Sequence, residues 1–350
     1  MIRPFRPEDL QGIVRIWNKC VEAGETLLYP VTDDAFLRLF CENPWCAPEN
    51  LLIAERDGRP LGFIHGVAPM SFPGARPGDA YLSQIMVDLA SRRQGIGRAL
   101  LNALAARMKA LGAGRLLISS LNPVNLSWRI PGSPGHDHNN MPGADMECPG
   151  FGFLTESGFS VLYREVAMYI DLSGYHPPEG LDELRDTLRR KGIETGPYDA
   201  ALHCGYDRMC DRVGSEYWRD VLRTEIDAWK KGQPNEDKRF WPDGRKPASP
   251  RILLTAVHDG QIVGFTGPVD RQKSGRGWFT GICTDPEFGR RGIATILFNN
   301  LLDAFVREGA AFTSLFTGED NPAKKIYLGA GMREARRFAL MALPLGGSHE

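Results

Sequence analysis

The chain has 350 residues, of which 42% are hydrophobic and 24% charged, a composition typical of globular proteins and long enough for two domains. Its net charge of −1 excludes a general electrostatic attraction to nucleic acid or to an anionic membrane surface. The charged N-terminus and the lack of a long apolar run favour a cytoplasmic protein without a membrane span. Seven cysteines with no Cys-x-x-Cys pair are predicted to be free thiols, most of them buried.

The first half of the chain opens with a predicted β-hairpin, because β-rich runs flank an Asp-Gly turn at residues 57–58. A further strand ends near Asp88, and the sequence Arg-Arg-Gln-Gly-Ile-Gly follows at 92–97. Apolar residues then recur at helical spacing up to Leu111. A helix is therefore predicted to begin at the glycine-containing turn.

The turn at 92–97 has the features of an anion-binding site. A helix N-terminus carries unpaired N–H groups and a partial positive charge, glycine lets a ligand approach the backbone, and arginines can bind phosphate oxygens. Together they predict a phosphate or pyrophosphate site. The dinucleotide pattern Gly-x-Gly-x-x-Gly fails because Leu100 stands at its third glycine, and no Walker loop is present. The alternative is an ordinary helix start with solvated arginines.

The rest of the first half contains a predicted strand at 115–120, an Asn-Pro pair at 122–123 and a last strand at 161–170. Between them lies a Gly/Pro-rich insertion at 131–150, which we expect to be a loop that covers a substrate cleft. A metal site is the less favoured alternative, because the spacing matches no known ligand set. Its candidate ligands would be His136, Asp137, His138 and Cys148.

The second half repeats this order of motifs after a Gly/Pro-rich boundary at 171–180. The repeated motifs are an Asp-Gly turn at 259–260, a strand ending near Asp285, a turn at 289–294, a strand at 312–316 and an Asn-Pro pair at 321–322. We interpret this as a tandem duplication with domains at 1–172 and 173–350. Each domain is predicted to be a mixed α/β unit with a central, mostly antiparallel sheet flanked by helices.

The set of motifs resembles the GNAT superfamily of acetyl-CoA-dependent N-acetyltransferases. That family carries [QR]-x-x-G-x-[GA] between its fourth strand and third helix, and this chain has Arg-x-x-Gly-x-Gly at 92–97. The strand and helix at 2–18, the Gly-Phe pair of the third strand and the Asn-x5-Tyr-x3-Gly sequence at 321–331 also fall in the family's order. The resemblance covers nearly the whole chain, twice, and implies acetyl-CoA as the cofactor.

The resemblance also implies which residues hold the cofactor. In the first half, pantetheine would face Ile85, Met86 and Val87, and the pyrophosphate would lie among Arg92, Arg93, Gln94, Gly95 and Gly97. The equivalents in the second half are Ile282, Cys283, Thr284, Arg290, Arg291, Gly292 and Ala294, with Asn321 as a further cofactor residue. Gly289 stands where the family has Arg or Gln, so the first half has the better-formed turn.

The resemblance places Tyr327 where the family carries its general acid. A tyrosine hydroxyl suits protonation of the leaving thiolate because its pKa near 10 is close to that of an alkyl thiol. The alternative role is packing of the ring under its helix. The equivalent position of the first half is Trp128 counted forward from Asn122, or Leu154 counted back from Gly158, and neither has an acidic hydroxyl. Known tandem members of the family catalyse in the C-terminal half, and we expect the same here; the less favoured alternative is that the first half acts without a tyrosine, as some family members do.

The predicted function is acetyl transfer to the primary amine of a small molecule by direct attack on the thioester. No general base stands out, so a water chain or an acid of the helix around 216–227 would take the proton. Acylation of a protein or peptide amine, and a catalytically silent CoA-binding or sensing module, stay open as alternatives. We expect no nucleic acid or membrane partner, and a monomer or homodimer.

Overall fold

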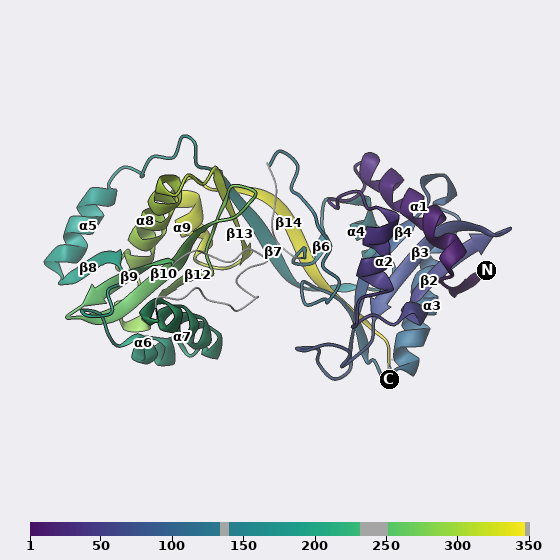
Figure 1. The fold of residues 1–350 in the computed structure, drawn as a ribbon, viewed down its shortest axis with the longest axis horizontal. Helices are drawn as coiled ribbons and strands as arrows, with labels where there is room; N and C mark the ends of the chain where they lie inside the picture. The colour runs from purple at the N-terminus through teal and green to yellow at the C-terminus, as the bar shows by residue number, and fades with distance from the viewer. Residues whose placement is uncertain (134–139, 232–250, 347–350) are drawn as a thin grey trace. The chain divides into compact units, whose positions relative to one another are not determined.

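The computed structural model describes residues 1–133, 140–231 and 251–346 (Figure 1). The chain forms two compact units, one made of Met1–Val166 with Arg336–Glu350 and the other of Ala167–Ala335. Each unit has a mixed α/β sheet with helices packed against it, which confirms the predicted fold class. The predicted domains 1–172 and 173–350 follow the sequence repeat and stay a prediction. They differ from the compact units mainly in the last strand.

The first unit contains the strand order β1-β2-β3-β4-β5-β14-β7. Its strands are β1 (Ile2–Pro4), β2 (Leu51–Arg56), β3 (Arg59–Val67), β4 (Asp79–Val87), β5 (Arg115–Ile118), β6 (Ala144–Asp145), β7 (Ser160–Asp171) and β14 (Arg333–Pro344). Its helices are α1 (Leu10–Glu22), α2 (Asp33–Phe40), α3 (Ile96–Ala110) and α4 (Pro149–Glu156), with 3₁₀ turns at Pro7–Asp9, Pro48–Asn50 and Leu89–Ser91.

The second unit repeats these elements in the order β7-β13-β11-β10-β9-β8, with β12 paired to β10. Its strands are β8 (Ile193–Pro197), β9 (Ile252–His258), β10 (Gln261–Arg271), β11 (Arg276–Trp278), β12 (Gly281–Thr284) and β13 (Phe312–Gly318). Its helices are α5 (Leu181–Arg190), α6 (Tyr206–Val213), α7 (Glu216–Lys230), α8 (Ile293–Arg307) and α9 (Lys324–Gly329), with a 3₁₀ turn at Pro286–Phe288.

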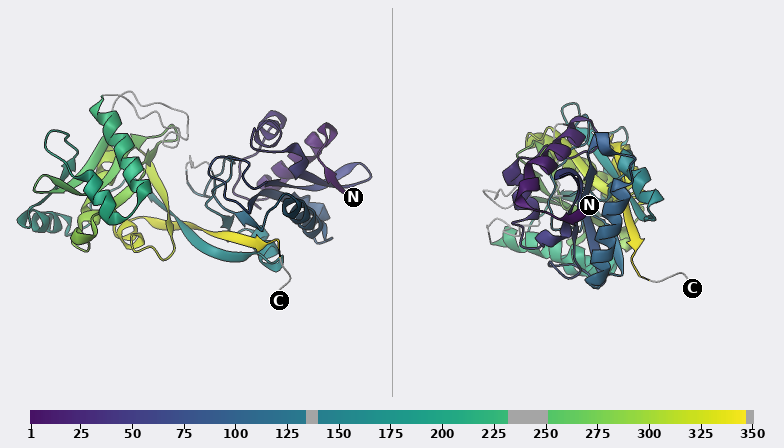
Figure 2. Two further views of the ribbon diagram at one scale, coloured as in Figure 1. Left: turned by 90° about the horizontal axis from the view of Figure 1, so that it is seen from below. Right: turned by 90° about the vertical axis from the view of Figure 1, so that its right-hand side faces the viewer.

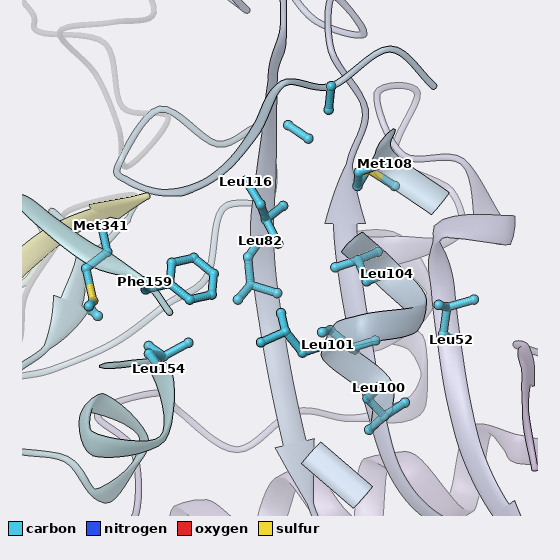
Figure 3. Close-up of a cluster of buried hydrophobic side chains, with 14 of the residues drawn as sticks. Leu52, Leu82, Leu100, Leu101, Leu104, Met108, Leu116, Leu154, Phe159 and Met341 are labelled. Atoms are coloured by element: carbon cyan, nitrogen blue, oxygen red, sulfur yellow. The ribbon is translucent and has the colours of Figure 1, made fainter. Parts of the chain in front are cut away.

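Alternation along β3 separates the two hydrophobic layers of the first unit. Phe63 faces α1 and stacks on Trp17 with ring centroids 6.3 Å apart. The next residue, Ile64, faces α3 and belongs to the same buried cluster as Leu104. Figure 3 labels Leu104 and other residues of this cluster. Leu104 of α3 fills the space above Gly66, where a Cβ atom would lie 2.9 Å from it. The sheet is therefore covered on both faces, and α3 is fixed over β3 and β4.

Both predicted hairpins form with the expected turn. Asp57 and Gly58 have φ angles of 52° and 74°, and Asp259 and Gly260 have 50° and 74°. Two consecutive residues with positive φ make a turn whose twist matches that of the flanking strands, and Asp-Gly favours it. The turns join β2 to β3 and β9 to β10, which confirms this part of the repeat.

The last strand of the chain belongs to the sheet of the first unit. Residues of β14 pair antiparallel with β5, with Met341 opposite Ile118 and Leu343 opposite Leu116. In the second unit β7 takes the place beside β13, and Tyr169 of β7 stacks on Phe312 at 5.6 Å. Figure 2 shows β14 in yellow beside β7 in teal. The final strand of the second repeat, β14, therefore continues the sheet of the first unit beside β5. The final strand of the first repeat, β7, lies beside β13 in the sheet of the second unit.

Two predictions from the composition concern the cysteine thiols and the absence of a membrane-spanning helix. All seven cysteines are unpaired, which confirms the predicted free thiols, and Cys20, Cys46, Cys210 and Cys283 are buried. Among the helices that the structure describes, none combines the length and the apolar character needed to cross a membrane.

Because β14 pairs with β5, a destabilising substitution in β14 is predicted to act on the first unit. Met341 is fully buried in the core of the first unit, so Met341→Ala should lower the free energy of unfolding by about 2–5 kcal/mol. Hydrogen exchange should show the loss of protection in β5, with β9 and β10 unaffected. Met332→Ala is the matched control, since Met332 is buried in the second unit. Loss of protection in β13 after Met341→Ala would contradict the assignment.

Candidate functional site

The site begins where β4 and β5 separate. The two strands pair in parallel only from Asp79 to Tyr81, whereas β4 continues against β3 as far as Val87. From Leu82 onward, no strand of the described structure pairs with the β5-facing edge of β4. That edge presents backbone N–H and C=O groups, which an extended ligand can pair with as an added strand.

A cavity of about 600 Å³ occupies the gap. One wall is β4 from Leu82 to Val87, with Ile118 of β5 opposite. One end is the turn at 91–98 before α3, and the other walls come from the segment after α1 and from β6 and α4. All of these residues belong to the first unit.

The turn before α3 has a backbone built to bind an anion. Arg93 and Gly95 both have positive φ, at 60° and 81°, and α3 begins at Ile96. In the described structure no side chain caps this helix, and its first turn has no acidic residue. Alternating left-handed residues direct successive N–H groups into one concavity, and the helix adds a partial positive charge. These groups suit a phosphate or pyrophosphate.

Gly97 lies where α4 approaches the turn. A Cβ atom at this position would lie 3.3 Å from the ring of Phe153, so only a small residue fits without moving that ring. Both Gly97 and Phe153 line the cavity. The glycine therefore allows α4 to close one side of the cavity next to the free N–H groups.

Arg92 is held by an ion pair inside the site. Its Nη1 atom donates to Glu25 Oε2 at 2.8 Å, and its Nε atom donates to the carbonyl oxygen of Val87 at 3.4 Å. Its Nη2 atom lies 3.7 Å from Cys20 Sγ. The arginine thus connects the turn to the end of β4 and to the segment that follows α1.

The structure brings the predicted cofactor residues of the first half together. The cavity is lined by Ile85, Met86, Val87, Arg92, Arg93, Gly95 and Gly97. Gln94 instead lines a neighbouring groove with Met1, Asp57 and Leu61. Their role in holding the cofactor stays a prediction.

Residues of the insertion at 131–150 also line the cavity, among them Asp145, which was not predicted as a site residue, and Cys148, which was considered only as a metal ligand. Asp145 is buried and accepts hydrogen bonds from Arg336 Nε at 2.9 Å and Nη2 at 2.8 Å. Cys148 also lines the cavity, and burial, followed by the charge of Asp145, raises the pKa of its thiol. The other residues of the considered metal site, His136 to His138, lie outside the described residues.

The second unit repeats the backbone of the site. β11 pairs in parallel with β13 at Arg276 and Gly277, and β12 then continues along β10 alone. Arg290 and Gly292 have φ angles of 58° and 89°, matching Arg93 and Gly95. The residues predicted to hold the cofactor here are distributed over these elements: Ile282, Cys283 and Thr284 on β12, Arg290, Arg291 and Gly292 in the turn, and Ala294 on α8.

The surroundings of the second turn differ from those of the first. A Cβ atom at Gly292 would lie 2.7 Å from Leu184 of α5, whereas one at Gly95 would meet nothing within 4 Å. The ring of Trp218 packs on Gly281 at the start of β12. Cys283 is buried in an apolar cluster with Cys210 and Phe265. The second turn therefore has the same backbone as the first but more side chains packed around it.

Tyr327 is a buried residue of α9. Its ring packs edge-on against Phe298 of α8, with centroids 4.9 Å apart, and burial raises its pKa to about 12. The hydroxyl is therefore protonated at neutral pH, as a general acid must be, and the ring also has the packing role considered as the alternative. In the first unit Leu154 lines the cavity, and Trp128 is fully buried against Phe338.

The two Asn-Pro motifs form similar turns. Asn321 Oδ1 accepts from the backbone N–H of Ala323 at 3.0 Å, and Asn122 Oδ1 accepts from Val124 at 3.0 Å. The amide of Asn122 also donates to Ser83 Oγ on β4 at 3.2 Å. Asn122 thereby fixes the chain just after the point where β5 leaves β4. A role of Asn321 in holding the cofactor stays a prediction.

Comparisons with known proteins agree with this geometry. Residues 13–127 and 215–331 match the family described as Acetyltransferase (GNAT) family. A relative named mycothiol acetyltransferase, from Clavibacter michiganensis subsp. michiganensis (strain NCPPB 382), is 24% identical over 340 residues, which cover 94% of this chain and 90% of the relative.

Solved structures show the same fold over nearly the whole chain. A tandem GNAT protein from the clavulanic acid biosynthesis pathway has a TM-score of 0.53 at 17% identity, covering 100% of this chain and 99% of that one. The glucosamine N-acetyltransferase region of a fungal multi-domain GH3 β-N-acetylglucosaminidase has a TM-score of 0.60 at 13% identity, covering 98% of this chain and 38% of that longer one. This chain belongs to the GNAT acetyltransferase family and contains its fold twice in tandem.

Proposed function

We propose that the chain is an acetyl-CoA-dependent N-acetyltransferase that acts on the primary amine of a small molecule. The observation that carries the proposal is the cavity between the separated strands β4 and β5, which ends at the uncapped turn before α3. The relative named mycothiol acetyltransferase, aligned over most of both chains, supports an acyl acceptor of low molecular weight.

The residues of the first unit fit the two polar parts of acetyl-CoA. The N–H groups of the turn around Gly95, together with the nearby arginines, suit the pyrophosphate. The unpaired edge of β4 at Ile85 to Val87 suits the amide groups of pantetheine, which would pair with it as an added strand. When bound, acetyl-CoA supplies the activated acetyl thioester.

We assign the role of general acid to Tyr327 in the second unit, where it would act on acetyl-CoA bound at that unit's own turn before α8. Its protonated hydroxyl would donate a proton to the departing thiolate while the neutral amine attacks the thioester carbonyl. Of the acids on α7, Glu225 is buried and paired with Arg251, which makes it a poor candidate for the base.

A second candidate function, CoA binding without catalysis, is favoured for the first unit by one observation. Leu154 lines its cavity four residues before Gly158, the same spacing that places Tyr327 before Gly331 in the second repeat. An apolar side chain there offers no proton to a leaving thiolate. The first unit would then hold the cofactor, and the second unit would carry out the transfer at its own turn.

Replacing the equivalent residues Gly97 and Ala294 with glutamate, one at a time, tests cofactor binding by the first unit separately from acetyl transfer by the second. Gly97→Glu places a carboxylate and extra volume beside Phe153, so it should weaken CoA binding by the first unit roughly tenfold or more. Ala294→Glu is the equivalent change in the second unit and should abolish acetyl transfer while leaving the first site intact. Isothermal titration with CoA and a turnover assay measure the two effects. Unchanged CoA binding in Gly97→Glu would show that the cavity is not the cofactor site.

Removal of the Tyr327 hydroxyl tests the proposed acid. Tyr327→Phe keeps the ring contact with Phe298, so the fold should persist while kcat falls by about 10²–10⁴-fold and the KM for acetyl-CoA changes little. The assay uses a panel of small amines and a lysine peptide, which also distinguishes the protein-acylating alternative. Unchanged kcat would remove Tyr327 from the mechanism. CoA binding without acetylation of any amine would favour the silent module.

The raised pKa of Tyr327 makes a separate prediction for the pH profile. Because its pKa lies at about 12, the hydroxyl stays protonated up to about pH 11, and its ionisation causes no loss of kcat below that pH. An alkaline fall of kcat below pH 10 that disappears in Tyr327→Phe would contradict the raised pKa.

A further inference from the structure

The ion pair of Glu25 and Arg92 lies within the cavity of the first unit. Both side chains line it and are partly exposed, at 26% and 33%. Glu25 follows the end of α1, and the next two residues, Thr26 and Leu27, also line the cavity. The pair therefore joins the cofactor turn to the wall formed by the segment after α1.

The contact between the two side chains leaves most of the guanidinium available. It consists of one hydrogen bond, from Nη1 to Oε2 at 2.8 Å, rather than the two parallel bonds of a bidentate pair. The other Arg92 contacts, to the Val87 carbonyl and to Cys20 Sγ, are long, at 3.4 and 3.7 Å. A pyrophosphate at the adjacent N–H groups offers more charge and more acceptor oxygens than one carboxylate.

Glu25 differs from the other carboxylates that line the described part of the cavity. Asp145 is buried and held by two hydrogen bonds from Arg336, so it is already neutralised. Glu156 is exposed at the end of α4. Glu25 is thus the lining carboxylate whose partner is itself a residue of the predicted phosphate turn. If that partner moves to a phosphate, a partly buried carboxylate is left without a counter-ion, which is unfavourable unless another cation binds.

We propose that Arg92 changes its partner when the cofactor binds: it releases Glu25 and binds the pyrophosphate. The freed carboxylate of Glu25 then binds a primary alkyl ammonium at the cavity wall. The ammonium subsite forms only after the cofactor has bound, so the cofactor precedes the cation. This inference rests on the proposed function in placing CoA at the first turn. It concerns binding and holds whichever unit performs the transfer.

The second unit has the opposite charge arrangement at the equivalent junction. There Arg212 of α6 supplies the cation and donates to Asp285, at 3.3 Å, and to Glu287. Asp285 precedes the 3₁₀ turn Pro286–Phe288, and Glu287 lies within it, just before the second glycine turn. Among the residues that the structure describes, no arginine of that turn pairs with a carboxylate of α6, so a phosphate bound there would free none. The exchange is therefore a property of the first unit.

A double-mutant cycle on CoA binding tests the exchange. It uses the full chain with Ala294→Glu, so that only the first turn binds, and isothermal titration with CoA. Glu25→Gln should tighten CoA binding roughly two- to five-fold, because it removes the competitor for Arg92. Arg92→Gln should weaken binding, and adding Glu25→Gln to Arg92→Gln should change nothing further. Glu22→Gln, an exposed carboxylate at the end of α1, is the matched control and should have no effect.

Three results of this cycle would overturn the exchange. Equal tightening by Glu25→Gln with and without Arg92 would indicate general electrostatics instead of competition. No change or weaker binding in Glu25→Gln would indicate a purely structural pair. A lack of CoA binding in the Ala294→Glu chain would overturn the proposed cofactor site as well, whereas the first two results leave that site standing.

The ammonium subsite is tested with hexylammonium as the probe and hexanol as its neutral control. Saturation-transfer NMR on the Ala294→Glu chain, in which the second turn is blocked, should detect hexylammonium with saturating CoA, but neither without CoA nor after the further change Glu25→Gln with CoA. Hexanol should bind equally in all three samples or in none. Hexylammonium binding that is independent of CoA, that persists in Glu25→Gln, or that is absent throughout would overturn the subsite.

Discussion

The separation of β4 from β5 is the constraint on which the rest of the site depends. The two strands pair only over Asp79–Tyr81, and β4 then continues with β3 alone to Val87. Asn122 fixes the departing chain through Ser83, so the gap is held by a hydrogen bond as well as by strand direction. An unpaired strand edge in a protein interior needs a partner for its N–H and C=O groups. This unpaired, partly exposed edge of β4 lines the cavity, and it is the reason for proposing an extended ligand that pairs with it.

The local parts of this arrangement could be predicted from sequence because each depends on a few neighbouring residues. Asp57-Gly58 and Asp259-Gly260 form their hairpins since both pairs tolerate the positive φ angles that the turn requires. The turns before α3 and α8 follow from Gly95 and Gly292 and from the apolar spacing that continues into the helices. The occurrence of the same backbone twice confirms that the repeat reflects structure and not chance similarity of short motifs.

The parts that could not be predicted depend on partners far away in the chain. The strands β7 and β14 have similar apolar alternation, and nothing in that pattern specifies that Met341 pairs with Ile118 of the first half. Asp145 enters the cavity wall because β6 pairs with β14, and its partner Arg336 is likewise remote in sequence. The ion pair of Arg92 with Glu25 was missed for the same reason, since their spacing has no helical or strand period. Position in the motif predicted Arg92 as a phosphate ligand, and the three-dimensional structure adds the carboxylate that pairs with it.

Burial raises the pKa of the proposed acid, so its proton transfer requires a thiolate that is itself made more basic. A phenol with a pKa of about 12 transfers its proton readily only to a base of comparable strength. A thiolate in water is weaker than that, but burial strengthens it by penalising the charged form. Burial, aided by nearby Cys210 and Asp285, likewise raises the pKa of the Cys283 thiol on β12 to about 12. We propose that a CoA thiolate released in a comparably buried environment would accept the proton of Tyr327, whereas Leu154, at the matching position of the first unit, has no proton to donate.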